Sequence, residues 1–304
     1  MDGLLVIDKP VGPTSHDVVQ RVRRLLAEPR IGHTGTLDPM ASGVLALVLG
    51  RATRLARFLI GADKSYEAVV RLGQSTDSGD VAGRPTGAPY TGPMPAAEAI
   101  DRAIEPFRGR FEQQPPALSA KKIAGQRSYT IARRGGGSAT VLPAPVSVTA
   151  YAIDVLNIAN GFVTLRIDCS AGFYIRALAL ALGEQLGTGA HLVALRRIRS
   201  GDLSLDDALD IAAWTAHAEG RQRVADAVVP LAAMLPSMPS VALTHDGVRH
   251  ATQGRWIGPA DLAGPFPSSL AGRDGHFRLL DSGGALVAVA DREGGLLHPS
   301  VVLM

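Results

Sequence analysis

Residues 31–49 read IGHTGTLDPMASGVLALVL, and this stretch decides how the first part of the chain is organised. Its first part, Ile31 to Gly43, brings together three glycines, two threonines, a histidine, an aspartate and a proline. Such a composition is typical of a loop, because glycine permits tight turns and the close approach of a bound molecule. Its second part, Val44 to Leu49, is an unbroken apolar run and predicts a buried central strand.

Regular elements are predicted on both sides of this stretch. Upstream, Gly3 to Lys9 predicts a short buried strand, and a helix from about His16 to Glu28 follows with Ser15 as its cap. Downstream, Lys64 to Leu72 alternates apolar and polar side chains, which predicts a strand with Tyr66 on its apolar face.

The remaining chain up to about residue 235 also reads as one domain of mixed strands and helices. We expect helices over 51–60 and 96–107, an extended segment over 113–124, a short helix over 126–134, paired strands over 146–155 and 161–169, a helix over 174–186, a strand over 191–198 and short acidic helices up to 235. Because strands occur in neighbouring pairs as well as alternating with helices, a purely parallel sheet is disfavoured. After Pro236 charges become sparse and short apolar runs recur between glycines and prolines, which predicts a small all-β module.

Length and composition exclude several classes of protein. The 304 residues correspond to two domains, or to one large domain with an appendage, at roughly 150 residues per domain. The single cysteine, Cys169, excludes an intramolecular disulfide and a cysteine-based zinc cluster. The start of the chain does not read as a signal peptide, and no run approaches the roughly 18 apolar residues of a membrane span. These features predict a protein of a reducing cytoplasm.

Positive charge is concentrated in two stretches of the chain. The formal net charge of +3 alone fits an anionic partner and a mildly basic protein equally well. Between Phe107 and Arg134, however, seven basic residues stand against Glu112 alone, and Arg196, Arg197 and Arg199 form a second cluster. This segregation is expected of a surface that faces a phosphate backbone.

The loop over residues 31–43 and the start of the strand after it also carry a family resemblance. GHTGTLDPMASGVL, at 32–45, resembles the signature of the TruB family of tRNA pseudouridine synthases, and six further blocks resemble family motifs in the same order. These blocks are GLLVIDKPVGPTS at 3–15, DKSYEA at 63–68, TDSGD at 76–80, QPPALSAKKIAGQRSY at 114–129, CSAGFYIRAL at 169–178 and GAHLVALRR at 189–197. The family usually has threonine where this chain has Phe173, and an acid where it has Ala181.

This resemblance implies a fold and an activity. The implied fold is α+β, with a pseudouridine synthase catalytic domain over 1–235 whose mixed, largely antiparallel central sheet is flanked by helices. A thumb insertion at about 107–145 grips RNA, and a small all-β barrel over 236–304 is similar to the PUA RNA-binding domain. The implied activity is that of a monomeric cytoplasmic enzyme that flips the uridine at position 55 out of the TΨC loop of tRNA and isomerises it to pseudouridine. The family uses no metal and no organic cofactor, and the eight histidines show no metal-ligand spacing.

Asp38 matches the catalytic aspartate of the family. Pseudouridine formation breaks a C–N glycosidic bond and makes a C–C bond to the same base, and a carboxylate can serve as the covalent nucleophile. Attack at C6 of the uracil and attack at C1′ of the ribose both remain open. No second carboxylate is evidently paired with Asp38, which disfavours glycosidase-type hydrolysis. Without the resemblance, Asp38 and Pro39 would read as an ordinary turn.

Arg176 and Tyr66 match the other two catalytic positions of the family. Arg176 is expected to pair with Asp38, since its apolar flanks leave a buried charge in need of a partner; the alternative is a surface arginine. The resemblance implies that Tyr66 stacks on the target base and makes it the favoured candidate for removing the C5 proton; the alternative is an ordinary core tyrosine.

The resemblance also implies a set of RNA contacts. Tyr174 and Leu195 would border the uracil, and His33 would wedge into the TΨC loop where the nucleotide leaves it. Lys64 and Asp80 would support the site. The remaining contacts would come from phosphate-binding thumb residues, namely Lys121, Lys122 and Arg127. A solvated basic loop is the alternative for the thumb.

Two other functions remain open at this point. A non-catalytic RNA-binding or tRNA-folding protein could keep the same surface without turnover, although binding alone requires none of Asp38, Tyr66 and Arg176. A related synthase for another RNA is equally compatible with these residues, because they do not encode the substrate.

Overall fold

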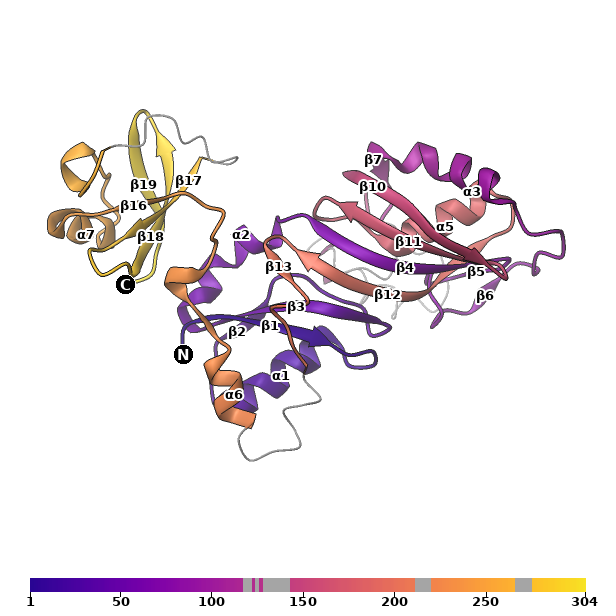
Figure 1. Ribbon diagram of the computed structural model, residues 1–304, viewed down its shortest axis with the longest axis horizontal. Helices are drawn as coiled ribbons and strands as arrows, with labels where there is room; N and C mark the ends of the chain where they lie inside the picture. Colours follow the sequence, from indigo (N-terminus) through magenta and orange to yellow (C-terminus); the bar gives the residue numbers. More distant parts are fainter. Residues whose placement is uncertain (117–121, 124–125, 128–142, 211–219, 266–274) are drawn as a thin grey trace.

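The computed structural model describes residues 1–116, 122–123, 126–127, 143–210, 220–265 and 275–304. Within them, an eleven-stranded sheet occupies most of the chain up to residue 230, and a four-stranded sheet forms the C-terminal part (Figure 1). No helix in these described ranges is both long enough and apolar enough to cross a membrane.

The large sheet is mixed and mostly antiparallel, as expected. Its main path runs β14 (Leu209–Asp210), β1 (Gly3–Lys9), β3 (Ala41–Leu49), β12 (Ala190–Ser200), β4 (Lys64–Leu72), β11 (Phe162–Cys169), β10 (Val146–Ala159) and β7 (Gly109–Gln113). Three short strands join it from the side: β2 (Ile31–His33) on β3, β13 (Leu203–Ser204) on β12 and β15 (Val229–Pro230) on β1. Among the described strands of this large sheet, only the pairs β1–β14 and β3–β12 are parallel.

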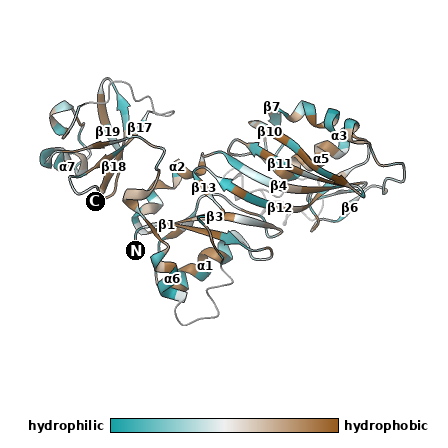
Figure 2. Ribbon diagram, in the orientation of Figure 1, coloured by the Kyte–Doolittle hydropathy of each residue, from teal (hydrophilic) through white to brown (hydrophobic). Residues whose placement is uncertain are grey.

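The two central strands β1 and β3 are buried on both faces, which explains their continuous apolar sequence. On one face, Leu5 and Leu47 belong to a hydrophobic cluster that extends across the sheet and includes residues of helices α1 (Ser15–Leu26), α3 (Ala97–Ile104) and α5 (Ile175–Gln185). On the other face, Leu4 and Val48 pack against the C-terminal part. Figure 2 shows β1 and β3 largely in the brown of hydrophobic residues.

Strand β4 has the bounds that the alternation of its side chains predicts. Tyr66, Ala68, Val70 and Leu72 are buried on the helix-covered face. The strand lies between β11 and β12, where Tyr66 stands opposite Ile167 on one side and Arg197 on the other. Tyr66, for which the resemblance implies a catalytic role, therefore lies in the middle of the large sheet.

The prediction that Ser15 caps helix α1 is wrong by one residue. Thr14 is the N-cap: its hydroxyl accepts a hydrogen bond from the Asp17 backbone N–H at 3.1 Å, and the Asp17 carboxylate accepts one from Thr14 N–H at 2.8 Å. This is a capping box, for which Thr14 has an acid three residues later and Ser15 does not. Ser15 is instead buried, and its hydroxyl bonds to the backbone of Leu37.

The loop predicted over residues 31–43 is shorter than expected. Ile31 to His33 pair with β3 as strand β2, and β3 begins at Ala41, so the connection comprises residues 34–40. Gly43 has a φ of 104°, and a Cβ there would lie 2.2 Å from the carbonyl oxygen of Arg197. Only glycine lets β3 and β12 approach this closely.

Other helix predictions hold in part. The expected helix over 51–60 is a 3₁₀ helix η1 (Gly50–Leu55) followed by α2 (Ala56–Ile60), and the one over 96–107 is α3 followed by η2 (Glu105–Phe107). The helix expected over 126–134 is wrong where it is described, because Gln126–Arg127 is strand β9, paired with β8 (Lys122–Ile123); residues 128–134 lie outside the described ranges. The expected acidic helices reduce to α6 (Gly220–Asp226) and η4 (Leu231–Ala233), preceded by β13 and β14, with 211–219 outside the described ranges.

The C-terminal part contains the expected sheet and a helix that was not expected. The sheet order is β16 (Ser240–Ala242), β17 (His276–Leu280), β18 (Leu286–Glu293) and β19 (Leu296–Val302), and the added elements are α7 (His245–Thr252) and η5 (Pro259–Asp261). Val289 and Val301 share a hydrophobic cluster with Val6 of β1. Arg51 donates a hydrogen bond to the carbonyl of Leu303 at 2.7 Å, so the two parts are joined by apolar and polar contacts.

Candidate active site

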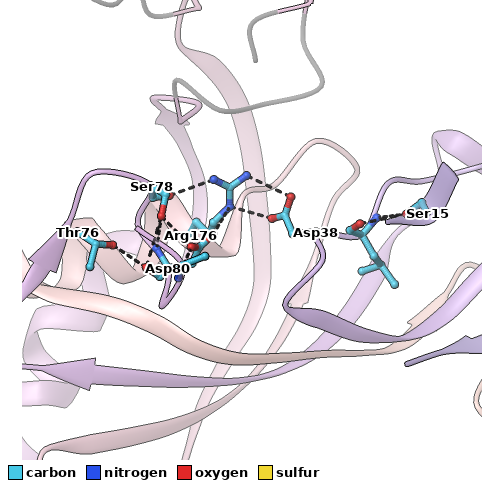
Figure 3. A network of polar contacts seen from close by, with 8 residues as sticks. Ser15, Asp38, Thr76, Ser78, Asp80 and Arg176 are labelled. Atoms are coloured by element: carbon cyan, nitrogen blue, oxygen red, sulfur yellow. Dashed lines mark hydrogen bonds and ion pairs between the residues drawn. The ribbon is translucent and has the colours of Figure 1, made fainter. Parts of the chain in front are cut away.

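Asp38 lies in the short connection between β2 and β3, and its backbone is held from several sides. The Ser15 hydroxyl accepts a hydrogen bond from Leu37 N–H at 2.8 Å and donates one to the Leu37 carbonyl at 3.0 Å (Figure 3). The carbonyl of Asp38 accepts from Ala41 N–H at 3.0 Å, and that of Pro39 accepts from Gly12 N–H at 2.8 Å. The carboxylate is thus presented by a backbone segment whose neighbours are fixed.

Arg176 makes the contact with Asp38 that the resemblance implies. Its Nε lies 2.8 Å from Asp38 Oδ2 and its Nη2 lies 3.4 Å from Oδ1, so the guanidinium contacts both carboxylate oxygens. Nη1 donates to the carbonyl of Ser78 at 3.0 Å. The Arg176 side chain is only 7% exposed, whereas that of Asp38 is 34% exposed. A buried cation therefore anchors a partly exposed carboxylate; Figure 3 shows the contact between the two side chains.

Asp80 contributes a second carboxylate to the same arginine. Its Oδ2 lies 3.7 Å from Arg176 Nε. Its Oδ1 accepts hydrogen bonds from the Ser78 hydroxyl at 2.7 Å and from Ala82 N–H at 3.0 Å, and the hydroxyl of Thr76 donates to its carbonyl at 2.8 Å. The loop containing Asp80 thus contacts the Arg176 guanidinium directly, through the Asp80 carboxylate and the Ser78 carbonyl. The sequence predicted only a supporting role for Asp80.

Tyr66 is buried beside a second arginine, Arg197. Burial raises the pKa of Tyr66, and the Arg197 guanidinium, which is hydrogen-bonded to it, opposes that rise. Arg197 is 2% exposed, and its guanidinium also donates to the carbonyls of Val44 at 2.7 Å and Gly35 at 3.0 Å. It therefore connects the phenol to the loop that carries Asp38.

The prediction that Arg196, Arg197 and Arg199 form a phosphate-facing cluster is wrong for Arg197. Strand β12 lies between β3 and β4, and the alternation of its side chains directs Arg197 into the protein interior. The two half-exposed neighbours have carboxylates nearby: Arg196 lies 2.7 Å from Asp8, and Arg199 lies 3.7 Å from Asp168.

Two buried lysines lie near the site and bond to backbone carbonyls. Lys9 Nζ donates to the carbonyl of Ala41 at 2.7 Å; burial lowers the pKa of Lys9 to about 8, with a partial offset from the charge of Asp38. Lys64 Nζ donates to the carbonyls of Ile60, at 2.7 Å, and Ala62, and burial lowers its pKa to about 8 as well. Lys64, expected to support the site, thus holds the turn before β4.

The expected base-contacting residues lie on three different elements of the catalytic part. Tyr174 is half-buried and is the N-cap of α5, two residues before Arg176. Leu195 stands opposite Ala41 of β3 and Ala68 of β4, between the strand that follows Asp38 and the strand of Tyr66. His33 ends β2, half-buried, opposite Leu47.

The expected phosphate contacts of the thumb are described only in part. Lys121 lies outside the described residues. Lys122 and Arg127 stand opposite each other across the short hairpin β8–β9.

The arrangement is suited to covalent chemistry at a carboxylate. Asp38 offers accessible oxygens, its charge is balanced by Arg176, and the phenol of Tyr66 lies on β4, which β12 separates from the strand that follows Asp38. Within the described residues, no group of three or more histidine, cysteine, aspartate or glutamate side chains is placed to hold a metal ion.

Known proteins match the chain over its full length. The model of the TruB family pseudouridylate synthase N-terminal domain matches residues 23–175, a range that includes Asp38 and Tyr66. The tRNA pseudouridine synthase B of Solibacter usitatus (strain Ellin6076) is 43% identical over 304 residues, with 100% of both chains covered. That of Dechloromonas aromatica (strain RCB) is 40% identical over 301 residues, with 98% of this chain and 94% of the relative covered.

A solved structure shares the fold. It is described as "Structure of H/ACA RNP bound to a substrate RNA containing 2'-deoxyuridine", has 25% sequence identity and a TM-score of 0.72, and the match covers 99% of this chain and 85% of that one. Together with the full-length relatives and the family model, this likeness shows that the chain belongs to the TruB family of pseudouridylate synthases, which are isomerases.

Proposed function

We propose that the protein isomerises the uridine at position 55 in the TΨC loop of cytoplasmic tRNA to pseudouridine, acting as a monomer. The observation that carries this proposal is the accessible carboxylate of Asp38 held at both oxygens by the buried Arg176. The relatives named tRNA pseudouridine synthase B support tRNA as the substrate class.

In the proposed reaction, Asp38 attacks the target nucleotide, either at C6 of the uracil or at C1′ of the ribose. Along either route the N1–C1′ bond breaks, the base turns within the site and a C5–C1′ bond forms. The bond between Asp38 and the nucleotide also breaks, and its electron pair returns to the carboxylate. C5 then loses its hydrogen and N1 takes up a proton. The atoms and electrons of substrate and product balance, so the reaction requires no oxidant, metal or organic cofactor.

The surrounding residues have distinct tasks in this proposal. Arg176 balances the charge of Asp38 and orients its carboxylate, and the carboxylate of Asp80 holds the Arg176 guanidinium in place. Tyr66 stacks on the uracil and accepts the C5 proton. Tyr174 and Leu195 border the base and exclude water during its rotation, and Lys64 stabilises the turn that precedes β4.

We assign residues 1–235 to the catalytic domain, about 107–145 to its thumb and 236–304 to a PUA-like RNA-binding domain. The boundary near residue 235 coincides with the change from the large sheet to the four-stranded one. The shared hydrophobic cluster would hold the second domain in a constant orientation to the first.

The direct test is to incubate the purified protein with an unmodified tRNA transcript and to map pseudouridine at nucleotide resolution. We expect one modified uridine, at position 55, and the same yield in the presence of a chelator. Binding without any pseudouridine would favour the non-catalytic tRNA-binding alternative. Modification of another RNA but not of tRNA would favour a synthase with a different substrate.

His33 allows base extrusion to be tested separately from the chemistry. It lies at the end of β2, five positions before Asp38. A stacking side chain can return roughly 1 to 3 kcal/mol of the unstacking cost of a flipped base. We therefore expect His33→Ala to slow modification of folded tRNA, to spare a stem–loop whose target uridine is already unstacked, and to be largely rescued by His33→Phe.

The measurement is the single-turnover rate of each His33 variant on both RNAs. Equal impairment of the alanine variant on the two RNAs, without rescue by phenylalanine, would assign His33 a proton-transfer or structural role instead.

Neutralising the thumb residues Lys121, Lys122 and Arg127 tests their proposed contacts with phosphates. We expect weaker tRNA binding and a salt dependence that is shallower by about 0.7 to 0.9 log–log units per lost contact, because fewer counterions are released. The rate at saturating tRNA should change less. The control is a variant in which the exposed Arg71, Arg102 and Arg166 become glutamine, which changes the net charge by the same amount. If the thumb variant kept the salt dependence of the wild type, the proposal would be contradicted.

A further inference from the structure

A buried glutamine outside the site described above contacts the start of the helix that carries Arg176. Gln113 is the last residue of strand β7 and is 4% exposed. Its side-chain carbonyl accepts a hydrogen bond from Tyr174 N–H at 2.8 Å, and its side-chain NH₂ donates to the Tyr174 carbonyl at 3.0 Å. One amide side chain thus holds both backbone polar groups of one residue, 61 positions away.

Helix α5 needs such an external anchor, because its own sequence provides little at this end. Tyr174 is the N-cap, and its side chain makes no capping hydrogen bond. The first turn contains no acidic residue and places the positive charge of Arg176 at the positive end of the helix dipole. The Tyr174 carbonyl accepts the first helical bond, from Leu178 N–H at 3.2 Å, in addition to the bond from Gln113.

An apolar contact two residues earlier reinforces the anchor. Phe111 and Gln113 lie on the same side of β7, because side chains alternate along a strand. Phe111 contacts Phe173 edge to face, with ring centroids 5.8 Å apart, directly before the amide contact at Tyr174. Phe173 occupies the position at which the family pattern usually has threonine, so this chain has an apolar contact where a polar residue is usual.

We propose that Gln113 is a positioning residue for the isomerisation: by holding the backbone of Tyr174 at both N–H and C=O, it fixes the start of α5 and with it the guanidinium of Arg176 opposite Asp38. The proposal rests on the proposed function. Arg176 is two residues after Tyr174. Its guanidinium can bond to both oxygens of Asp38 only if the first turn of α5 has the right position along the helix axis and the right rotation about it. Gln113 itself touches neither Asp38 nor Arg176 in any of the contacts described.

Two substitutions of Gln113 remove the anchor to different degrees. Gln113→Leu has a similar volume and lacks both hydrogen bonds. Gln113→Glu keeps an acceptor for Tyr174 N–H and loses the donor to the Tyr174 carbonyl. We expect the single-turnover rate at saturating tRNA to fall about 10- to 100-fold in the leucine variant, the scale on which a displacement of reacting groups by 1 Å acts, with a smaller loss in the glutamate variant and tRNA affinity little changed in both.

A matched control and a double mutant separate positioning from general stabilisation. Gln74→Leu removes another glutamine amide, which donates to the carbonyl of Thr86 at 2.9 Å, and should leave the rate unchanged. If Gln113 acts through Arg176, then Gln113→Leu should cost much less in an Arg176→Lys background than in the wild type, because residues that act as a unit are not additive. Thermal unfolding of every variant shows whether it folds. If Gln113→Leu does not fold, the positioning role is tested with Gln113→Glu alone.

The possible outcomes are distinct. A wild type that makes no pseudouridine in tRNA would refute the proposed function itself. With an active wild type, an unchanged rate in the Gln113 variants, or losses that multiply fully with that of Arg176→Lys, would refute the positioning role and leave the proposed function standing.

Discussion

Replacing Asp38 by asparagine should abolish pseudouridine formation and leave tRNA binding largely intact. The amide has the shape of the carboxylate and can still accept a hydrogen bond from Arg176, whose Nε lies 2.8 Å from the carboxylate now. It has no negative charge with which to attack carbon. We expect the single-turnover rate to fall by more than about 10³-fold, because the loss of a covalent nucleophile leaves only the contributions of binding and electrostatics.

The assay for Asp38→Asn compares this rate and the tRNA dissociation constant with those of the wild type. Asp101→Asn is the matched control, since Asp101 is exposed on α3 and pairs with Arg108 at 3.1 Å, a surface contact that contributes little to stability. Substantial turnover by the Asp38 variant, measured in material free of spontaneous deamidation back to aspartate, would show that another group attacks the nucleotide.

The proposed roles of Asp38 and Arg176 depend on a contact that local sequence patterns could not reveal. The two residues are 138 positions apart, and the expectation that they meet came from the family motifs. The apolar flanks of Arg176 indicated only that it needs a partner. Asp80 was expected as a supporting residue, but its place beside the same guanidinium depends on how the loop after β4 folds back onto Leu192.

Elements whose signal is local were predicted well. Strands β1 and β4 have the predicted bounds because an apolar run and an alternating pattern are properties of consecutive residues. The choice of Thr14 over Ser15 as N-cap was also available locally, since Asp17 completes a capping box only with Thr14. Helix α7 was missed because it is short and lies in a segment rich in glycine and proline, although Thr244 caps it.

Contacts between distant strands account for the remaining differences. Arg197 stands in a run of arginines that reads as a basic surface, and its burial follows from the position of β12 between β3 and β4. Gln113 has no local signal at all, because its partner Tyr174 is brought to it by the pairing of β7 with β10 and by the packing of Phe111 on Phe173. Such residues become visible only once the sheet is assembled.

Tyr66→Phe should retain tRNA binding and base stacking but lose most of the turnover. The ring remains, and only the phenol oxygen is removed from a buried position, at a cost of about 1.5 to 3 kcal/mol for its hydrogen bond with the charged Arg197. Arg197 keeps its bonds to the carbonyls of Gly35 and Val44, so the fold around Asp38 should persist. Since the proposal assigns removal of the C5 proton to this oxygen, we expect its loss to slow turnover roughly 10²- to 10⁴-fold, the usual contribution of general acid–base catalysis.

The pH dependence of the wild type follows from the same environment. Because burial raises the pKa of Tyr66, the group is a neutral phenol at pH 7, and only its small phenolate fraction can accept a proton. That fraction grows about tenfold per pH unit below the pKa, so the rate should rise with pH from neutral to mildly alkaline conditions. Tyr66→Phe should lose this rise.

A deuterium label at C5 of the target uridine assigns the step that Tyr66 controls. If Tyr66 accepts the C5 proton, its removal makes that step limiting, and the rate difference between unlabelled and labelled tRNA should be larger for Tyr66→Phe than for the wild type. A phenylalanine variant with a wild-type rate would leave Tyr66 as a stacking residue alone. A slow variant whose rate is insensitive to the label would instead show that the phenol acts before proton removal, in the attack by Asp38 or in the rotation of the base. In that case Arg197 would act by fixing the loop at Gly35 and not by favouring the phenolate.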